Sequence, residues 1–146
     1  LRNHVLVLGD SIRPVEAMHD QASRQQRAGS NPSVFRSTAR TLSENCARAA
    51  RTVDPVIEFA AGLSTSDQRF GDRAVNRWRT ALDQLKDEMG RCSTAASEQG
   101  AGVGDPAPSQ VTAISTSARK SVADYRKAEF ELLNTLKIQI DPRDRI

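Results

Sequence analysis

Aromatic residues are scarce in this chain of 146 residues: four Phe, one Tyr and one Trp make up 4% of the sequence. A core must therefore be built mainly from Leu, Ile, Val and Ala, and such small side chains favour closely packed helices. Long apolar runs are absent too, and none approaches the roughly 20 residues that a membrane-spanning helix needs. No signal peptide is recognisable and the chain begins with Leu1, so we expect a mature form or an excised domain.

A strong excess of one charge is also lacking. Lys and Arg number 21 and Asp and Glu number 18, which gives a net charge of +3 at pH 7. Because this excess is small and no long basic run exists, nucleic acid is not an expected partner. Hydrophobic residues at 38% and charged residues at 27% are typical of a soluble, ordered protein.

What the sequence does contain is a repeated spacing of apolar residues, four and then three apart, in four blocks. This spacing is typical of helices that pack against one another, and no block alternates as a strand does. The positions are Leu1, Val5, Leu8, Ile12, Val15, His19 and Ala22; Phe35, Ala39, Leu42, Cys46, Ala49, Val53, Val56, Ala60 and Leu63; Val75, Trp78, Leu82, Leu85, Met89, Cys92 and Ala96; and Val111, Ile114, Ala118, Ser121, Tyr125, Ala128 and Leu132. We call each set the core-facing stripe of its helix.

The predicted fold is all-α: an antiparallel up-down-up-down four-helix bundle that forms one domain over residues 1–146. The helices are expected at about 3–28, 32–61, 66–98 and 109–140, with a flexible loop at 99–108 and a tail at 141–146. Gly29 marks the end of the first helix, and Asn31-Pro32 supplies an N-cap and a first-turn proline for the second. Gly62 closes the second helix.

Two prolines lie inside the helical pattern, Pro14 and Pro55. Each removes a backbone hydrogen bond and should bend or break its helix. The apolar spacing continues through both positions, so we expect kinks. The alternative is that either helix consists of two shorter ones.

The segment VLVLGDSI, residues 5–12, contains the one motif with an enzyme-like form. Gly9-Asp10-Ser11 resembles the Gly-Asp-Ser block of the lipase and esterase family of that name, in which the serine is the nucleophile. That resemblance implies a parallel sheet and a histidine late in the chain. Here the only histidines are His4 and His19, so we expect a helix whose Gly9, Asp10 and Ser11 face solvent, and no catalytic residue.

Metal and cofactor motifs are incomplete. Glu16 and His19 have the Glu-x-x-His spacing of di-iron bundles, but that chemistry needs the motif twice. Haem attachment through Cys-x-x-Cys-His is absent as well. We therefore expect no metal, no cofactor and a structural role for His19 at the edge of the core.

The two cysteines, Cys46 and Cys92, both fall on core-facing stripes. If the second and third helices turn around residues 62–66, Cys46 lies opposite about residues 81–86, on the order of 10 to 15 Å from Cys92 along the axis. A disulfide needs a Cα separation below about 7 Å. We therefore predict two free buried thiols, which slightly favours the cytoplasm; an extracytoplasmic location is the alternative if the chain is an excised domain.

Arginines form stripes on the outer faces of two helices. The third helix carries Arg69, Arg73 and Arg77 at four-residue spacing, and the second carries Arg40 and Arg48 among others. Such stripes are usually solvated. If they act, we expect them to hold an acidic partner or an anionic head group.

With no catalytic constellation, the sequence favours a non-enzymatic helical-bundle module that recognises a protein through a helix face or groove. One alternative is an extracytoplasmic ligand-sensing domain of a bacterial receptor. The other is a carrier of a small apolar ligand, such as haem or lipid, in a pocket lined by His19, Trp78 and Ser121. Neither the partner nor the oligomeric state follows from the sequence.

Overall fold

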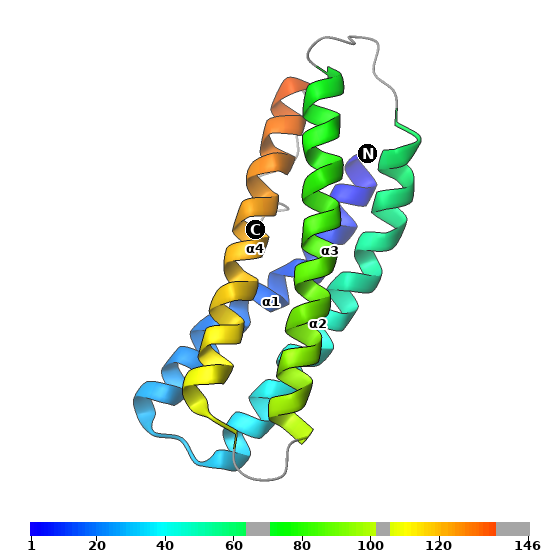
Figure 1. The fold of residues 1–146 in the computed structure, drawn as a ribbon. Helices are drawn as coiled ribbons and strands as arrows, with labels where there is room; N and C mark the ends of the chain where they lie inside the picture. Colours follow the sequence, from blue (N-terminus) through cyan, green and yellow to red (C-terminus); the bar gives the residue numbers. More distant parts are fainter. Residues whose placement is uncertain (64–70, 102–105, 137–146) are drawn as a thin grey trace.

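The computed structural model describes residues 1–63, 71–101 and 106–136, and these residues form four helices and no strand. The helices are α1 (Arg2–Ala28), α2 (Pro32–Ala61), α3 (Gly71–Ala101) and α4 (Pro108–Thr135). Each packs against the next along the chain, and α1 also packs against α4, so the bundle closes. Figure 1 shows α3 and α4 next to each other, with α1 behind them. The predicted four-helix bundle is confirmed.

The turn between α1 and α2 follows from local chemistry. Gly29 adopts a φ of 66°, and the N–H groups of Gly29 and Ser30 donate to the carbonyls of Gln26 and Gln25 at 3.3 and 3.1 Å. This is the Schellman arrangement that ends many helices. The Asn31 side chain then accepts a hydrogen bond from the N–H of Val34 at 3.2 Å and so caps α2.

Both internal prolines lie within continuous helices. α1 passes through Pro14 and α2 passes through Pro55, so neither helix consists of two shorter ones. Proline removes a helical hydrogen bond, which costs about 3 kcal/mol. Burial on either side of it opposes that loss: Val15 is fully buried beside Pro14, and Val53 and Val56 flank Pro55 in the core.

The core-facing stripes of α1, α2 and α3 are buried almost throughout, as their spacing predicts. In α4 the predicted stripe is wrong at alternate positions. Ile114, Ser121 and Ala128 are only partly buried, and the residue that follows each of them is buried instead. The buried set of α4 is Val111, Ser115, Ala118, Val122, Tyr125, Glu129, Leu132 and Leu133. Ser115 and Glu129 are polar, so an apolar pattern could not reveal them.

Two arginines link the ends of α2 and α3. Arg79 of α3 donates through Nε to the Ala60 carbonyl at 2.6 Å and through Nη2 to the Leu63 carbonyl at 2.8 Å. Arg40 of α2 donates through Nε to the carbonyl of Gly100 at 3.2 Å. A Cβ at Gly100 would lie 2.8 Å from Cγ of Arg40, so this close approach requires glycine. Each helix thus caps the carboxyl end of its neighbour.

Cys46 and Cys92 form a disulfide between α2 and α3, with their Cα atoms 6.0 Å apart. The prediction of two free thiols is therefore wrong. The two residues lie on their core-facing stripes as expected, but they lie at the same level of the bundle.

The error lies in the register of α3 against α2. Cys46 lies opposite Cys92 and not opposite residues 81–86, so the residues of α3 that face α2 lie further along the chain than predicted. Other contacts agree with this register: the Ser43 hydroxyl donates to the Ser93 carbonyl at 2.8 Å, and the Lys86 ammonium lies 2.6 Å from the Asp54 carboxylate.

Candidate functional site

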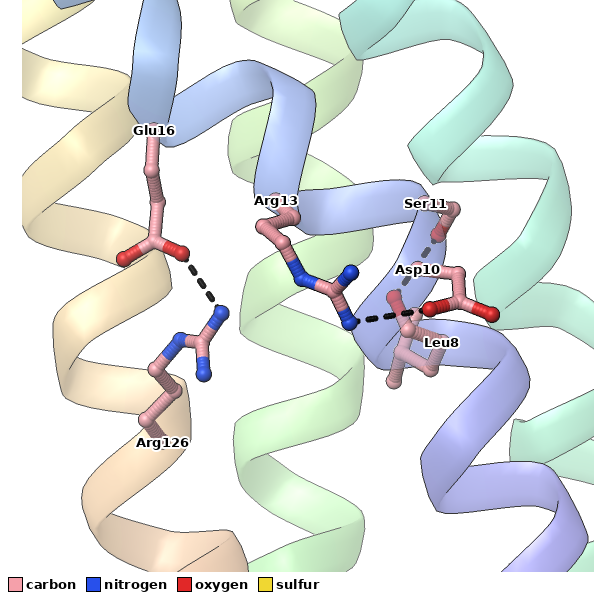
Figure 2. A network of polar contacts seen from close by, with 6 residues as sticks. All are labelled: Leu8, Asp10, Ser11, Arg13, Glu16 and Arg126. Atoms are coloured by element: carbon pink, nitrogen blue, oxygen red, sulfur yellow. Dashed lines mark hydrogen bonds and ion pairs between the residues drawn. The ribbon is translucent and has the colours of Figure 1, made fainter. Parts of the chain in front are cut away.

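Ser11, the residue in the nucleophile's place, lies on the inner side of α1. The residue is only 8% exposed, and its hydroxyl donates to the carbonyl of Leu8 at 2.9 Å (Figure 2). The helical interpretation of the Gly-Asp-Ser block is thus confirmed. The expected exposure is correct for Asp10 and wrong for Gly9 and Ser11, which are buried. A serine that bonds to its own helix in this way has a structural role.

Neither histidine serves Ser11. The ring of His4 stacks on Phe59 with centroids 4.3 Å apart, and Nδ1 of His19 lies 2.9 Å from Nη1 of Arg119. Both histidines of the chain belong to the described residues, and both are engaged elsewhere. Neither histidine is therefore placed to act as a base for Ser11.

Glu16 and His19, the spacing typical of di-iron bundles, are both directed at arginines of α4. Arg126 donates to the Glu16 carboxylate, as Figure 2 shows, and Arg119 contacts both His19 and Asp20. Among the described residues no group of three or more His, Cys, Asp or Glu side chains could hold a metal ion. These contacts join α1 to α4 along their boundary.

Trp78 lies inside the bundle, where it is hydrogen-bonded to Tyr125. Its indole N–H donates to the Tyr125 hydroxyl at 3.0 Å, and the hydroxyl is also hydrogen-bonded to the Glu129 carboxylate. Burial, followed by the nearby charge of Glu129, raises the pKa of Tyr125 well above its ordinary value. Trp78 is fully buried, so it supports Tyr125 and lines no exposed surface.

A row of hollows lies between α3 and α4, and we call it the α3–α4 groove. It consists of three hollows of about 670, 380 and 280 Å³. The first two share Ala81, Gln84 and Asp124, and the last two share Glu88 and Ser117, so the groove is continuous. Its residues are Arg73, Asn76, Arg77, Thr80, Ala81, Gln84, Leu85, Glu88, Arg91, Cys92 and Ala95 of α3, and Ile114, Ser117, Ala118, Lys120, Ser121, Asp124, Tyr125 and Ala128 of α4.

The lining of the groove contains both small and charged side chains. Alanines and serines from both helices allow another molecule to approach closely; they are Ala81, Ala95, Ser117, Ala118, Ser121 and Ala128. The four cations of the lining are Arg73, Arg77, Arg91 and Lys120, and the two carboxylates are Glu88 and Asp124. Tyr125 contributes to the middle hollow. The groove therefore carries an excess of positive charge.

The structure places the arginines of the predicted site in different surroundings. Arg73 and Arg77 lie at one end of the α3–α4 groove, whereas Arg69 lies outside the described residues. Arg40 caps α3, and Arg48 is exposed on α2. Among the arginines of the predicted site that the structure describes, Arg73 and Arg77 thus come together at a concave surface.

The three residues predicted to line a ligand pocket also lie apart. Ser121 lines the α3–α4 groove, Trp78 is buried beneath Tyr125, and His19 faces Arg119 at the boundary of α1 and α4. Sequence reasoning missed Gln84 and Asp124, which link two of the hollows. They are ordinary polar residues on exposed helix positions, and nothing in the pattern distinguishes them.

Comparison of the chain with protein-family models, with curated proteins and with solved structures finds no match. No helix in the described part of the chain combines the length and the apolar character needed to cross a membrane.

Proposed function

We propose that this chain is a non-enzymatic interaction module that binds a protein partner in the α3–α4 groove. The observation that carries the proposal is the continuity of the groove along two neighbouring helices, with small side chains and charged side chains in its lining. Grooves of this kind accept a segment of another protein by shape and charge.

The disulfide bears on where the module acts. Disulfides persist in oxidising compartments and are rare in the reducing cytoplasm. Cys46–Cys92 joins the two helices that also cap each other through Arg40 and Arg79, so it belongs to the most tightly connected part of the bundle. We therefore place the module outside the cytoplasm, which reverses the preference derived from free thiols.

An extracytoplasmic ligand-sensing domain is the second candidate, and the middle hollow favours it. This hollow has a volume of about 380 Å³, within the usual range for small-molecule sites, and Ser121, Gln84 and Asp124 supply polar side chains to its lining. A carrier of an apolar ligand has less support, because the buried Trp78 and Tyr125 fill the space in which such a ligand would lie.

Peptide selection followed by blocking of the groove tests the proposal. Random linear peptides displayed on phage are selected against the oxidised protein, and the affinities of the binders are measured by calorimetry. Gln84→Trp and Ser117→Trp place a large side chain in the groove at two exposed positions. We expect each substitution to weaken binding by about tenfold or more, since the indole occupies space that the peptide needs.

Ser37→Trp is the matched control, because Ser37 is an exposed serine on α2, away from the groove. Thermal unfolding followed by circular dichroism shows whether each variant is folded. Two results would refute the groove as the binding surface. One is that the affinity falls as much for Ser37→Trp as for the groove variants, and the other is that neither groove substitution changes the affinity. A small-molecule screen that stabilises the wild-type protein but not Ser117→Trp would instead support the sensing domain.

A further inference from the structure

We propose, on the basis of the proposed function, that the partner segment is an amphipathic α-helix with acidic residues at the end that lies over Arg73 and Arg77. Three features of the α3–α4 groove support this: the backbone of its walls, the small side chains of its floor and the distribution of its charges.

The walls favour a helix over an extended strand. Both walls are helices whose backbone N–H and C=O groups are bonded within α3 and α4, apart from those of the end turns. The groove therefore offers few backbone groups to an extended peptide, whose own N–H and C=O groups would lose their hydrogen bonds to water on binding. A bound helix satisfies its backbone internally and pays no such penalty.

The dimensions and the floor fit a helix as well. The groove extends along α3 from Arg73 to Ala95 and along α4 from Ala128 to Ile114. At 1.5 Å per residue these spans are about 33 and 21 Å, which suits a helix of roughly 14 to 22 residues. Alanine and serine on the floor, among them Ala81 and Ser121, permit the short interaxial distances at which helices pack.

The charges are unequal along the groove. In the middle and at the far end, Lys120 lies 3.3 Å from Asp124 and Arg91 lies 2.9 Å from Glu88, so these cations are compensated within their own helices. At the near end Arg73 has no ion pair within the described residues.

Arg77 contacts Glu131 at this same end, and both side chains of that pair are exposed. An exposed ion pair contributes little stability, so a carboxylate of the partner can replace Glu131. Arg73 and Arg77 thus offer positive charge at this end of the groove, where it complements acidic residues of a bound helix.

The test compares two display libraries of equal diversity. One presents randomised positions on the face of a stable helical hairpin, and the other presents linear peptides with a central proline that cannot form a continuous helix. Binders whose affinity falls with Ser117→Trp are retained as groove binders. We expect these to come from the helical library and to be enriched in Asp and Glu at one end of the helix.

Charge reversal then tests the orientation. The double variant Arg73→Glu/Arg77→Glu should bind the acidic helices about tenfold or more weakly than the wild-type protein does. Replacing the acidic residues of these helices with Lys should restore their binding to the variant. Arg48→Glu/Arg51→Glu, which reverses two exposed charges on α2, should leave the affinity unchanged.

Groove binders that come only from the linear library, or that show no acidic end, would refute the helical acidic partner but not the groove as the binding surface. Failure of the Lys-substituted helices to bind Arg73→Glu/Arg77→Glu would have the same meaning. Loss of anionic vesicle binding in Arg73→Glu/Arg77→Glu, with the helical binders unaffected, would identify a membrane surface as the partner and also refute it. If every selected binder has the same affinity for Ser117→Trp as for the wild-type protein, the proposed function is refuted instead.

Discussion

Tyr125 connects the core of this protein to its candidate binding surface. It is buried, it accepts a hydrogen bond from Trp78, and part of it lines the middle hollow of the α3–α4 groove. Its neighbour Glu129 is a buried carboxylate, so ionisation of Tyr125 would place two negative charges together away from water. The neutral phenol is therefore the form that the fold accommodates.

This environment gives the protein a specific response to alkali. The pKa of Tyr125 is raised in the folded state above its ordinary value of about 10, first by burial and then by Glu129. Because the pKa of Tyr125 is higher in the folded protein, the folded state keeps the phenolic proton more tightly than the unfolded state does. The free energy of unfolding is therefore at its full value below the unfolded pKa and falls as the pH rises through the folded pKa. We expect the ultraviolet absorbance of the tyrosinate, from the single tyrosine of the chain, to appear only well above pH 10 or together with unfolding.

Glu129→Gln separates the two causes of this shift. Removing the carboxylate charge should lower the pH at which Tyr125 ionises, although burial should still keep it above the ordinary value. Tyr125→Phe serves as the blank for the absorbance. A tyrosine that titrates near pH 10 in the folded wild-type protein would show that the phenol is exposed to water.

At the scale of the helices, Arg40 and Arg79 have structural roles, because each caps the carboxyl end of the neighbouring helix. α2 has no basic residue in its last turn, and Arg79 supplies that charge from α3. Its guanidinium reaches the carbonyls of both Ala60 and Leu63 and also the Asn76 side chain. A planar fork with several donors suits this task better than an ammonium does.

Arg79→Ala should lower the free energy of unfolding by about 1 to 3 kcal/mol, because charged hydrogen bonds to the end of α2 are lost. Arg79→Lys should recover only part of this, since one ammonium cannot reproduce the fork. Urea unfolding followed by circular dichroism provides the measurement. Arg73→Ala, at an exposed position of the same helix, should stay within about 0.5 kcal/mol. Equal effects of Arg79→Ala and Arg73→Ala would contradict the cap.

The core-facing stripes lead to a second prediction at this scale. Leu82 of α3 and Leu42 of α2 are fully buried, so replacing either with Ala should cost about 2 to 5 kcal/mol in the same measurement. A cost near that of Arg73→Ala would mean that the helix face is assigned wrongly.

Sequence periodicity predicted the helices well because burial of an apolar face leaves a regular trace. It failed in α4, where Ser115 and Glu129 occupy buried positions of the stripe. The Ser115 hydroxyl bonds to the carbonyl of Thr112, and Glu129 is linked to Tyr125. Polar residues whose hydrogen bonds are met inside the bundle carry no hydrophobic signal, so the pattern assigned their neighbours Ile114 and Ala128 to the core instead.

For the whole molecule, the register between helices decides both the disulfide and the groove. Heptad spacing shows which face of a helix is buried, but it does not show how far one helix is displaced along another. That displacement places Cys46 beside Cys92 and determines which exposed residues of α3 and α4 become neighbours. Gln84 and Asp124 line the same two hollows because of this displacement, which is why the groove could not be predicted from the sequence.

The disulfide should make a large contribution to the stability of the bundle. Cys46 and Cys92 are 46 residues apart, and closing a loop of that length in the unfolded chain corresponds to about 4 kcal/mol in the chain-entropy account. We expect urea unfolding in the presence of a dithiol reductant to give a free energy lower by up to about this amount. The double variant Cys46→Ala/Cys92→Ala should resemble the reduced protein and respond to reductant no further.

Mass spectrometry of the protein purified without reductant tests the bond itself. The intact chain should be lighter than the reduced chain by the two hydrogens lost on oxidation, and digestion should release the peptides that contain Cys46 and Cys92 as a linked pair. Thiol alkylation should fail in the native protein and also in urea, because no free cysteine exists. Alkylation of both residues in urea without reductant would show that the thiols are free. That result would contradict the disulfide and remove the support for the proposal that the module acts outside the cytoplasm.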